Sequence, residues 1–412
     1  MRPSSSWNET SIRKEVLSLS RELIRIPSVY SHEHEISRFI HGRLKDWGLS
    51  PSYVDVPGHG PDVVVEVGGR HLPAIVLNGH TDTIEVVRGW KHDPFGAKVE
   101  NGVLYGLGAL DMKCGIAEMM IAIERMNELD AVDGFRVVFQ AVTGEEDSGI
   151  GTSTLISSGW FKGARAAIVG EGFGGLKALT NGRRGGSRYE IQVIGKSAHG
   201  ATAHLGVNAV SDASRVVHAI EGMKMKTARG LLSDSFEPLV ESQMVQEICG
   251  GSVSLSVPDK CTIGVYRATL PNAEVDSSQQ IRSTLRELCL RSKVKVRFIG
   301  DPGEILYPFL TSPSSELVRI ASETIENVTG ERPRLVCGLS ECDDNLIAHE
   351  LKLPAVSFGP GEPANIGRYH QAEECIRISQ LGHAARIYFE TVFSLGSMMS
   401  RRCLAMSSSG NS

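Results

Sequence analysis

Apolar residues recur along the chain with two spacings, one typical of amphipathic helices and one typical of buried strands. Apolar side chains at every third or fourth position predict helices at residues 9–26, 32–47, 314–329 and 380–395. Continuous apolar runs predict strands buried on both faces at residues 62–68, 74–78, 135–142, 166–170 and 353–358. Helices and strands that alternate in this way predict an α/β domain with a mostly parallel sheet flanked by helices.

Residues 187–299 change character, with strands that alternate apolar and polar side chains. The expected elements are a strand from 187, a helix at 206–222, strands near 250–257 and 261–268, a helix at 276–291 and a strand at 294–298. This order is that of a ferredoxin-like α+β domain. We therefore expect a second domain, residues 185–299, inserted into a catalytic domain made of residues 1–184 and 300–396. The Ser- and Met-rich end, residues 397–412, is predicted to be a disordered tail.

Composition narrows the possible classes of protein. The 412 residues are 41% hydrophobic and 22% charged, as in an ordinary globular protein. A net charge of −5 gives no sign of a nucleic-acid surface, and no apolar run is long enough to span a membrane. The N-terminal residues lack the apolar core of a secretory signal, and the eight cysteines are scattered without a Cys-x-x-Cys motif. We therefore expect a cytoplasmic protein with reduced thiols.

Candidate chemistry lies where the predicted strands and one glycine-rich turn end. The residues concerned are His80, Asp82, Asp111, Glu145, Glu146 and Glu171. Taken singly, each has a plainer explanation as a surface polar residue, a helix N-cap or a solvated loop residue. Parallel strands would, however, bring their carboxyl ends to one edge of the sheet, which is where α/β proteins bind ligands.

A late strand at residues 353–358 leads into Gly359-Pro360-Gly361, and His370 follows. Two histidines and at least three carboxylates are the set that holds two divalent ions about 3.5–4 Å apart through a bridging carboxylate. A water between such ions has a lowered pKa and becomes a nucleophile, and a further carboxylate must then carry its proton to the leaving group. Zinc suits these ligands best, and manganese or cobalt would also suit them.

Five spaced motifs, in register over nearly the whole chain, resemble the M20 metallopeptidases. They are His80-Thr81-Asp82, Gly108-Ala109-Leu110-Asp111-Met112-Lys113, Gly144-Glu145-Glu146, Gly170-Glu171 and the late His370. The family includes acetylornithine deacetylase, succinyl-diaminopimelate desuccinylase, aminoacylase and carboxypeptidase-G2-like enzymes. The resemblance implies a catalytic domain with an inserted lid, a hydrolytic activity and two metal ions.

The resemblance also implies a role for each motif residue. His80, Asp111 and Glu171 would bind one ion, and Asp111, Glu146 and His370 would bind the other. Glu145 would be the general base and acid, and Asp82 would orient His80 from behind. The peptide bond between Asp111 and Met112 would be cis.

The loop Gly195-Lys196-Ser197-Ala198-His199 resembles the lid motif of the family. In the family its histidine stabilises the oxyanion, often in the active site of a dimer partner. The resemblance therefore implies a catalytic role for His199 and a homodimer formed through the lid domain. Without the motif, His199 would be an ordinary histidine of a surface loop.

The residues that would contact a substrate depart from the family pattern. Leu255 stands in place of an Asn, and Val265-Tyr266-Arg267 replaces Asp-x-Arg. Gly338-Leu339-Ser340-Glu341 replaces Gly-Thr-Ser-Asp. Arg267 is expected either to clamp a substrate carboxylate or to form a salt bridge within the lid. The candidate substrate-binding residues are Arg267, Ser340, Gly359 and Gly361.

These features predict a dinuclear metal-dependent hydrolase that cleaves an amide-type C–N bond of a small carboxylate-bearing substrate, such as an N-acyl amino acid or a dipeptide. The apolar Leu255 and the altered Glu341 leave a second hypothesis open, a metal-dependent aminohydrolase or deaminase of a small, possibly aromatic, amino-carboxylate. A third hypothesis is a non-catalytic metal-dependent binding protein on the same scaffold. The intact Glu145 and His199 argue against it, because a binding protein needs neither residue.

Overall fold

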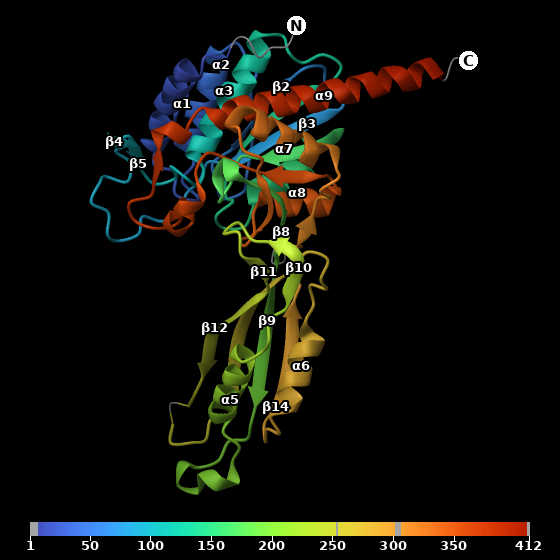
Figure 1. Cartoon of the computed structure of the whole chain (residues 1–412). Helices are drawn as coiled ribbons and strands as arrows, with labels where there is room; N and C mark the ends of the chain where they lie inside the picture. The colour runs from blue at the N-terminus through green and yellow to red at the C-terminus, as the bar shows by residue number, and fades with distance from the viewer. Residues whose placement is uncertain (1–6, 253, 301–305, 410–412) are drawn as a thin grey trace.

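The computed structural model describes residues 7–252, 254–300 and 306–409. An α/β body contains the first and the last of the described helices, and an elongated antiparallel sheet projects from it (Figure 1). None of the helices in these three ranges combines the length and the apolar character needed to cross a membrane.

The body is built around one large mixed sheet. In spatial order its strands are β1 (Ser52–Val54), β2 (Asp62–Val67), β6 (Arg136–Val142), β3 (Ala74–His80), β7 (Ala164–Val169), β17 (Ala355–Ser357), β8 (Ala178–Arg183) and β15 (Phe309–Leu310), with β16 (Arg334–Gly338) also paired to β8. Parallel pairing joins β6, β3, β7 and β17 at the centre, whereas the pairs toward β1 and β15 are antiparallel. The sheet is therefore mixed, and the prediction of a mostly parallel sheet holds only for its centre.

Strand β3 shows why this sheet is covered on both faces. Its residues are all buried, and successive side chains point to opposite faces of the sheet. Ile75 and Leu77 join the larger apolar core, whereas Ala74 and Val76 join a second, smaller core on the other side.

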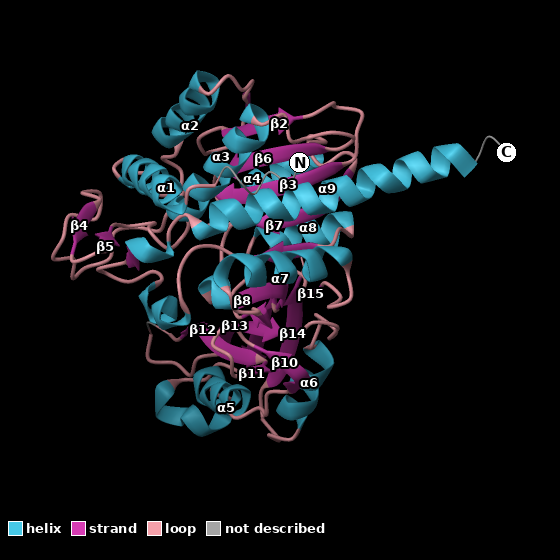
Figure 2. Cartoon of the chain, turned by 45° about the horizontal axis from the view of Figure 1, so that its top comes forward, coloured by secondary structure: helices cyan, strands magenta, loops and turns pink. Residues whose placement is uncertain are grey.

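Helices cover the two faces of the large sheet. The larger core is shared with α1 (Glu9–Ile24), α2 (His34–Asp46), α3 (Lys113–Glu128), α7 (Glu316–Thr329) and α9 (His383–Ser409). The smaller core is shared with α4 (Ile150–Ser157) and α8 (Asp343–Leu351). Figure 2 shows α9 running across the body and extending beyond it.

Helix α9 corrects the prediction for the C-terminal end. It continues to Ser409, so the segment predicted as a disordered tail from residue 397 is helical over 397–409. Met398 and Met399 pack against the larger core, and Ser400 Oγ donates to the Asp133 carbonyl. These contacts explain why the helix continues through residues 397–400. Residues 410–412 lie outside the described part of the chain.

A second sheet has the order β12 (Ser242–Gly250), β13 (Lys260–Thr269), β9 (Gly185–Ile194), β14 (Lys293–Ile299), and all its pairs are antiparallel. Helices α5 (Ala209–Glu221) and α6 (Ser278–Arg286) pack on it. A hairpin of β10 (Thr227–Leu232) and β11 (Pro238–Val240) lies between α5 and β12 in the chain. The strand predicted at 250–257 is wrong, because β12 ends at Gly250 and begins eight residues earlier.

Short elements complete the structure. A small sheet is formed by β18 (Cys375–Arg377), β5 (Val103–Tyr105) and β4 (Lys98–Glu100). The 3-10 turns are η2 (Gly175–Lys177), η3 (Gly200–Leu205), η4 (Pro363–Arg368) and η5 (Ile378–Gln380). Strands β4 and β5 form a hairpin within this small sheet.

Candidate metal centre

Three adjacent parallel strands place the candidate ligands at one edge of the large sheet. His80 is the last residue of β3, which lies between β6 and β7. Strand β6 leads into Glu145 and Glu146, and β7 leads through Gly170 into Glu171. The expected convergence of strand ends is therefore present, because neighbouring parallel strands finish on the same side.

Asp111 lies between the two histidines and contacts each with a different carboxylate oxygen. Its Oδ1 is 3.0 Å from His80 Nε2, and its Oδ2 is 3.3 Å from His370 Nε2. His370 Nε2 is also 3.1 Å from Glu146 Oε2. This is the arrangement expected of a carboxylate that bridges two ions, each with a histidine on its own side. The peptide bond between Asp111 and Met112 is cis, as the resemblance implies.

Asp82 lies behind this group and joins two of its loops. Its Oδ2 accepts a hydrogen bond from the Glu146 backbone N–H at 3.0 Å. His80 Nδ1 is 3.1 Å from the Asp82 carbonyl oxygen and 3.7 Å from its Oδ1. The backbone carbonyl therefore orients His80 more directly than the carboxylate does. Asp82 Oδ1 is buried and has no hydrogen-bond partner within the described ranges.

Glu171 is held by two residues that the sequence argument missed. The Cys342 thiol donates to Glu171 Oε2 at 2.8 Å, and Arg183 Nη2 lies 3.8 Å from Oε1. As a result, Glu171 groups with Glu145 and Cys342, whereas His80, Asp111 and Glu146 form a separate group of mutually close ligand atoms. Two signals were present in the sequence. Cys342 directly follows the stretch that departs from the family pattern, and Arg183 ends an otherwise uncharged strand.

Arg183 is fully buried and connects several residues around the centre. Its Nε forms an ion pair with Asp344 Oδ1 at 2.7 Å, and its Nη1 donates to Ser340 Oγ at 3.2 Å. Ser357 donates to the same Asp344 carboxylate. Ser340, a candidate for substrate binding, is therefore engaged in holding Arg183.

Glu374 fixes the loop that carries Asp111. Its carboxylate accepts hydrogen bonds from the backbone N–H groups of Gly108 at 2.9 Å, Leu110 at 2.6 Å and Asp111 at 3.2 Å. Three donors converging on one buried carboxylate leave the loop little freedom. Residues that orient metal ligands in this way influence metal affinity strongly.

We predict that Glu374→Gln lowers the affinity for zinc about 10–100-fold, because one carboxylate oxygen becomes an N–H₂ donor facing N–H donors. A competition titration against a chromophoric chelator measures this affinity. Glu373→Gln is the matched control, because Glu373 instead accepts from the Lys91 and His92 backbones on the surface. Wild-type affinity in the Glu374→Gln protein would show that the loop does not depend on this carboxylate.

The electrostatics of the cluster indicate missing positive charge. Burial raises the pKa of Glu145 well above its usual value and raises the pKa of Glu146, with further rises from neighbouring carboxylates. Burial and Asp111 raise the pKa of Glu171 to about 7, although Arg183 opposes this. Hydrogen bonds to Asp111 and Glu146 raise the pKa of His370 to about 10. Buried carboxylates packed this closely require compensation, and nitrogen and oxygen donors around a shared aspartate fit divalent ions.

Three backbone segments, at Gly115, Gly170 and Gly359, lie very close together beside Glu171. A Cβ on Gly115, in α3, would lie 2.3 Å from the Gly170 carbonyl oxygen, and one on Gly359 would lie 2.6 Å from the same atom. Only glycine fits at both positions, so Gly359 serves packing next to a candidate ligand. Gly361 has a φ of 134°, which also favours glycine.

His199 does not reach the metal centre of its own chain. It directly precedes η3, at the end of the second sheet that points away from the body (Figure 1). The ten residues of β9 separate this end from the body, which corresponds to about 30 Å of extended chain. His199 Nδ1 accepts from the Ala201 backbone N–H.

Arg267 is enclosed within the second sheet rather than open to a substrate. Its side chain is fully buried, and its Nη2 lies 2.8 Å from Glu241 Oε2 and 2.9 Å from Gln280 Oε1. The salt-bridge alternative is therefore the one observed, and the expectation of a substrate clamp is not supported.

Glu341, which departs from the family pattern, contacts the residue that follows the departure at Val265. The Tyr266 hydroxyl, on β13, donates to Glu341 Oε1 at 2.6 Å. Tyr266 belongs to the second sheet, whereas Glu341 lies in the body between β16 and α8. This hydrogen bond joins the two parts of the molecule close to Cys342.

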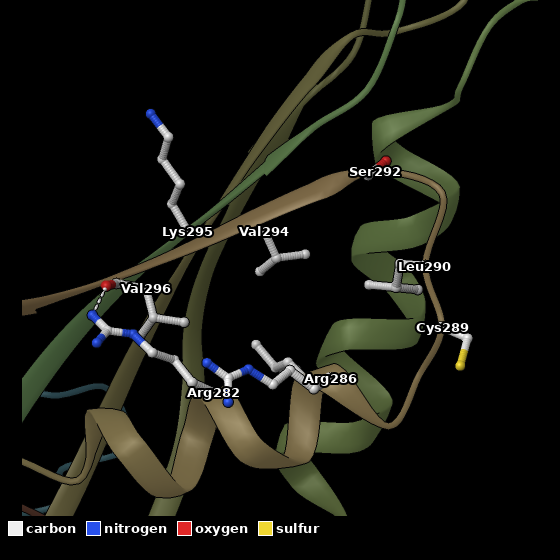
Figure 3. A pocket seen from close by; sticks show the side chains of 9 residues that line it. Arg282, Arg286, Cys289, Leu290, Ser292, Val294, Lys295 and Val296 are labelled. Atoms are coloured by element: carbon white, nitrogen blue, oxygen red, sulfur yellow. Dashed lines mark hydrogen bonds between the residues drawn. The ribbon is translucent and has the colours of Figure 1, made fainter.

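The groove of about 600 Å³ between α6 and β14 lies in the second sheet and not at the metal centre (Figure 3). Its lining includes Arg282, Arg286 and Lys295, and Arg282 donates to the Val296 carbonyl. A smaller cavity of about 210 Å³ does border the centre, and Glu145, Glu146, Glu341, Cys342 and Asp343 are among the residues that line it.

Comparisons with known proteins agree with this geometry. The model of peptidase family M20/M25/M40 matches residues 76–394. Succinyl-diaminopimelate desuccinylase of Acinetobacter baylyi is 28% identical over 391 residues, which cover 91% of this chain and 97% of that protein.

Solved structures of other proteins share the fold. A tripeptidase from Staphylococcus aureus superimposes with a TM-score of 0.73 at 20% identity, covering 94% of this chain and 99% of that one. The Bacillus subtilis YXEP protein, a dinuclear metal-binding peptidase from the M20 family, gives 0.69 at 14% identity and covers 94% and 99%. The chain therefore belongs to peptidase family M20/M25/M40 and is a metallohydrolase.

Proposed function

We propose that the protein is a dinuclear hydrolase that cleaves an amide-type C–N bond, with Glu145 as the group that moves the proton. The observation that carries the proposal is the position of Asp111, whose two carboxylate oxygens face His80 and His370 separately. Glu171 would complete the set around one ion, and Glu146 the set around the other. When bound, the ions would activate a water molecule and polarise the scissile carbonyl group.

Glu145 suits the role of proton carrier because of its environment. Burial raises its pKa well above that of an exposed glutamate, which favours the protonated form that a proton carrier passes through. Within the described part of the chain, its carboxylate forms no hydrogen bond with another residue and is free to exchange a proton. Asp82 fixes the backbone directly after it through the Glu146 N–H.

The substrate we propose is an N-acyl amino acid or a short peptide with a free carboxylate. This proposal follows the desuccinylases among the relatives, and the tripeptidase among the solved structures shares the fold. Because Arg267 is fully buried and paired with Glu241, its side chain is not the group that we propose for the carboxylate. Ser340 is exposed beside Arg183 and stays a candidate. The four-stranded sheet of residues 185–299 would act as the lid over this substrate.

A substrate panel on protein reconstituted with zinc, manganese or cobalt tests the proposed reaction. We expect a carboxylic acid and a free amine from N-acyl amino acids or dipeptides. Release of ammonia from aminoaromatic acids, with no carboxylic acid fragment, would show that the protein is a deaminase instead. Metal-loaded protein that is inactive on the whole panel would favour the binding protein.

We also propose a homodimer in which His199 acts in the metal centre of the other copy. Its distance from its own centre supports this, as do Met244 and Ile248, which are exposed apolar residues on the edge strand β12. A cytoplasmic location accords with the free cysteines of the described residues.

Mixing two inactive variants tests this arrangement. We predict that Glu145→Gln and His199→Ala proteins, each nearly inactive alone, regain activity when unfolded together and refolded. Each mixed dimer would contain one site with an intact Glu145 and an intact His199. Random pairing makes half of the dimers mixed, so about a quarter of the wild-type activity is expected from an equal mixture. Activity that stays at the level of the separate variants would place His199 outside the partner site.

A further inference from the structure

The thiol of Cys342 is packed directly against a candidate metal ligand. Its Sγ lies 2.8 Å from Glu171 Oε2, and the residue is 3% exposed. Glu145, Glu171 and Cys342 each offer one donor atom, and the three atoms lie within 4.8 Å of one another. Cys342 is therefore part of a group of potential ligands, whereas the remaining cysteines among the described residues belong to no such group.

The local structure holds this thiol in one orientation. Cys342 is the N-cap of α8, where the Asn345 backbone N–H donates to the Cys342 carbonyl oxygen at 2.9 Å and the Asn345 side chain accepts from the Cys342 N–H at 3.0 Å. These hydrogen bonds fix the backbone at Cys342, and the buried thiol lies beside the Glu171 carboxylate. The Arg183 guanidinium lies on the other side of Glu171.

We propose that Cys342 is a sulfur ligand of the ion that Glu171 binds. This inference rests on the dinuclear centre of the proposed function and adds a ligand to it. The Cys342 sulfur and Glu171 Oε2 are only 2.8 Å apart, so one ion could contact both atoms. Binding the ion would release the thiol proton to solvent, as it does at other cysteine sites.

A sulfur ligand would also affect which metal the protein selects. Thiolate favours zinc, whereas a site of carboxylates and histidines alone also accepts manganese readily. We therefore expect the ion at Glu171 to be zinc, or cobalt as its spectroscopic substitute, in preference to manganese. The ion shared by Glu146 and His370 has only oxygen and nitrogen ligands and would be less selective.

The competing explanation is that Cys342 only orients Glu171 through its S–H···O hydrogen bond. Serine distinguishes the two roles, because its hydroxyl can donate the same hydrogen bond but provides no sulfur. A positioning role would survive in Cys342→Ser, whereas a sulfur–metal bond would not.

Absorption spectra of the full-length protein loaded with Co²⁺ test the proposal. We expect a near-ultraviolet sulfur-to-cobalt charge-transfer band in the wild type that is absent in Cys342→Ser. Cys249→Ser is the control, because Cys249 is an exposed thiol on β12 and its loss should leave the band in place. A wild-type spectrum without the band, or a band that persists in Cys342→Ser, would overturn the proposal.

X-ray absorption of the zinc-loaded wild type keeps the proposal testable even when Cys342→Ser fails to fold. We expect a sulfur scatterer at about 2.3 Å from zinc, and a shell of only oxygen and nitrogen would contradict the proposal. Hydrolysis is measured on the same preparations. Sulfur ligation without hydrolysis of any amide would refute the proposed reaction and leave the ligand in place. Hydrolysis without sulfur ligation would refute the ligand role of Cys342 and leave the proposed reaction in place.

Discussion

Glu145→Gln is expected to lower kcat about 10²–10⁴-fold while the protein retains its bound metal. The amide of glutamine has nearly the shape of the carboxylate but cannot take up a proton. In our assignment Glu145 donates to no ion, so the centre formed by His80, Asp111, Glu146, Glu171 and His370 should still fill. Steady-state kinetics and metal analysis of the same protein measure both effects.

The adjacent residue provides the matched control for this experiment. Glu146 lies 3.1 Å from His370 and is assigned as a ligand, so Glu146→Gln should lose both metal and activity. The two neighbouring substitutions therefore separate proton transfer from metal binding. If Glu145→Gln also loses metal, then Glu145 is itself a ligand, and the proton must be carried by another group.

Arg183→Met is expected to lower the free energy of unfolding by about 5 kcal/mol, near the upper end for breaking a buried ion pair. The substitution leaves the Asp344 carboxylate buried without its cation, and it removes the nearest positive charge from Glu171. Denaturant unfolding of the metal-free protein measures the loss without the contribution of bound ions. Metal analysis of the folded fraction then shows whether Glu171 still binds.

Arg184→Met is the control for this second experiment. Arg184 donates to the carbonyl oxygens of Leu339 and Val240, and no ion pair with a carboxylate is found for it within the described ranges. Its removal should therefore cost clearly less than that of Arg183. An equal loss in both variants would mean that the buried charge of Asp344 does not dominate the effect.

The sequence predicts the centre of the fold better than its edges, for a physical reason. Strands β3, β6 and β7 are buried on both faces, so their continuous apolar runs are distinctive. Strand β8 (Ala178–Arg183) was missed because it contains Asn181 and Arg183, which are buried with partners from distant segments. Burial of polar residues depends on tertiary contacts, and no local pattern reveals it.

The same distinction applies to the candidate site. His80, Asp111, Glu146 and His370 follow spaced motifs, and the structure brings their side chains together. Cys342 and Arg183 belong to none of these motifs, and only the tertiary structure brings them to Glu171: α8 packs against β7, and β8 lies next to β17, the neighbour of β7 in the sheet. For Arg267, the sequence left two roles open, and the choice depended on Glu241, which directly precedes β12 and pairs with Arg267 across the sheet.

The place of β17 in the large sheet has a consequence for how the protein is made. This strand lies between β7 and β8, although nearly two hundred residues separate it from β7 in the chain. Helix α9, which follows it, packs against α3. The core around the metal centre therefore cannot close on the ribosome until almost the whole chain has emerged. The sheet of residues 185–299 is formed by strands that are contiguous in sequence, so it can fold earlier. Until β17 and α9 are available, apolar strands in the N-terminal part of the body stay exposed.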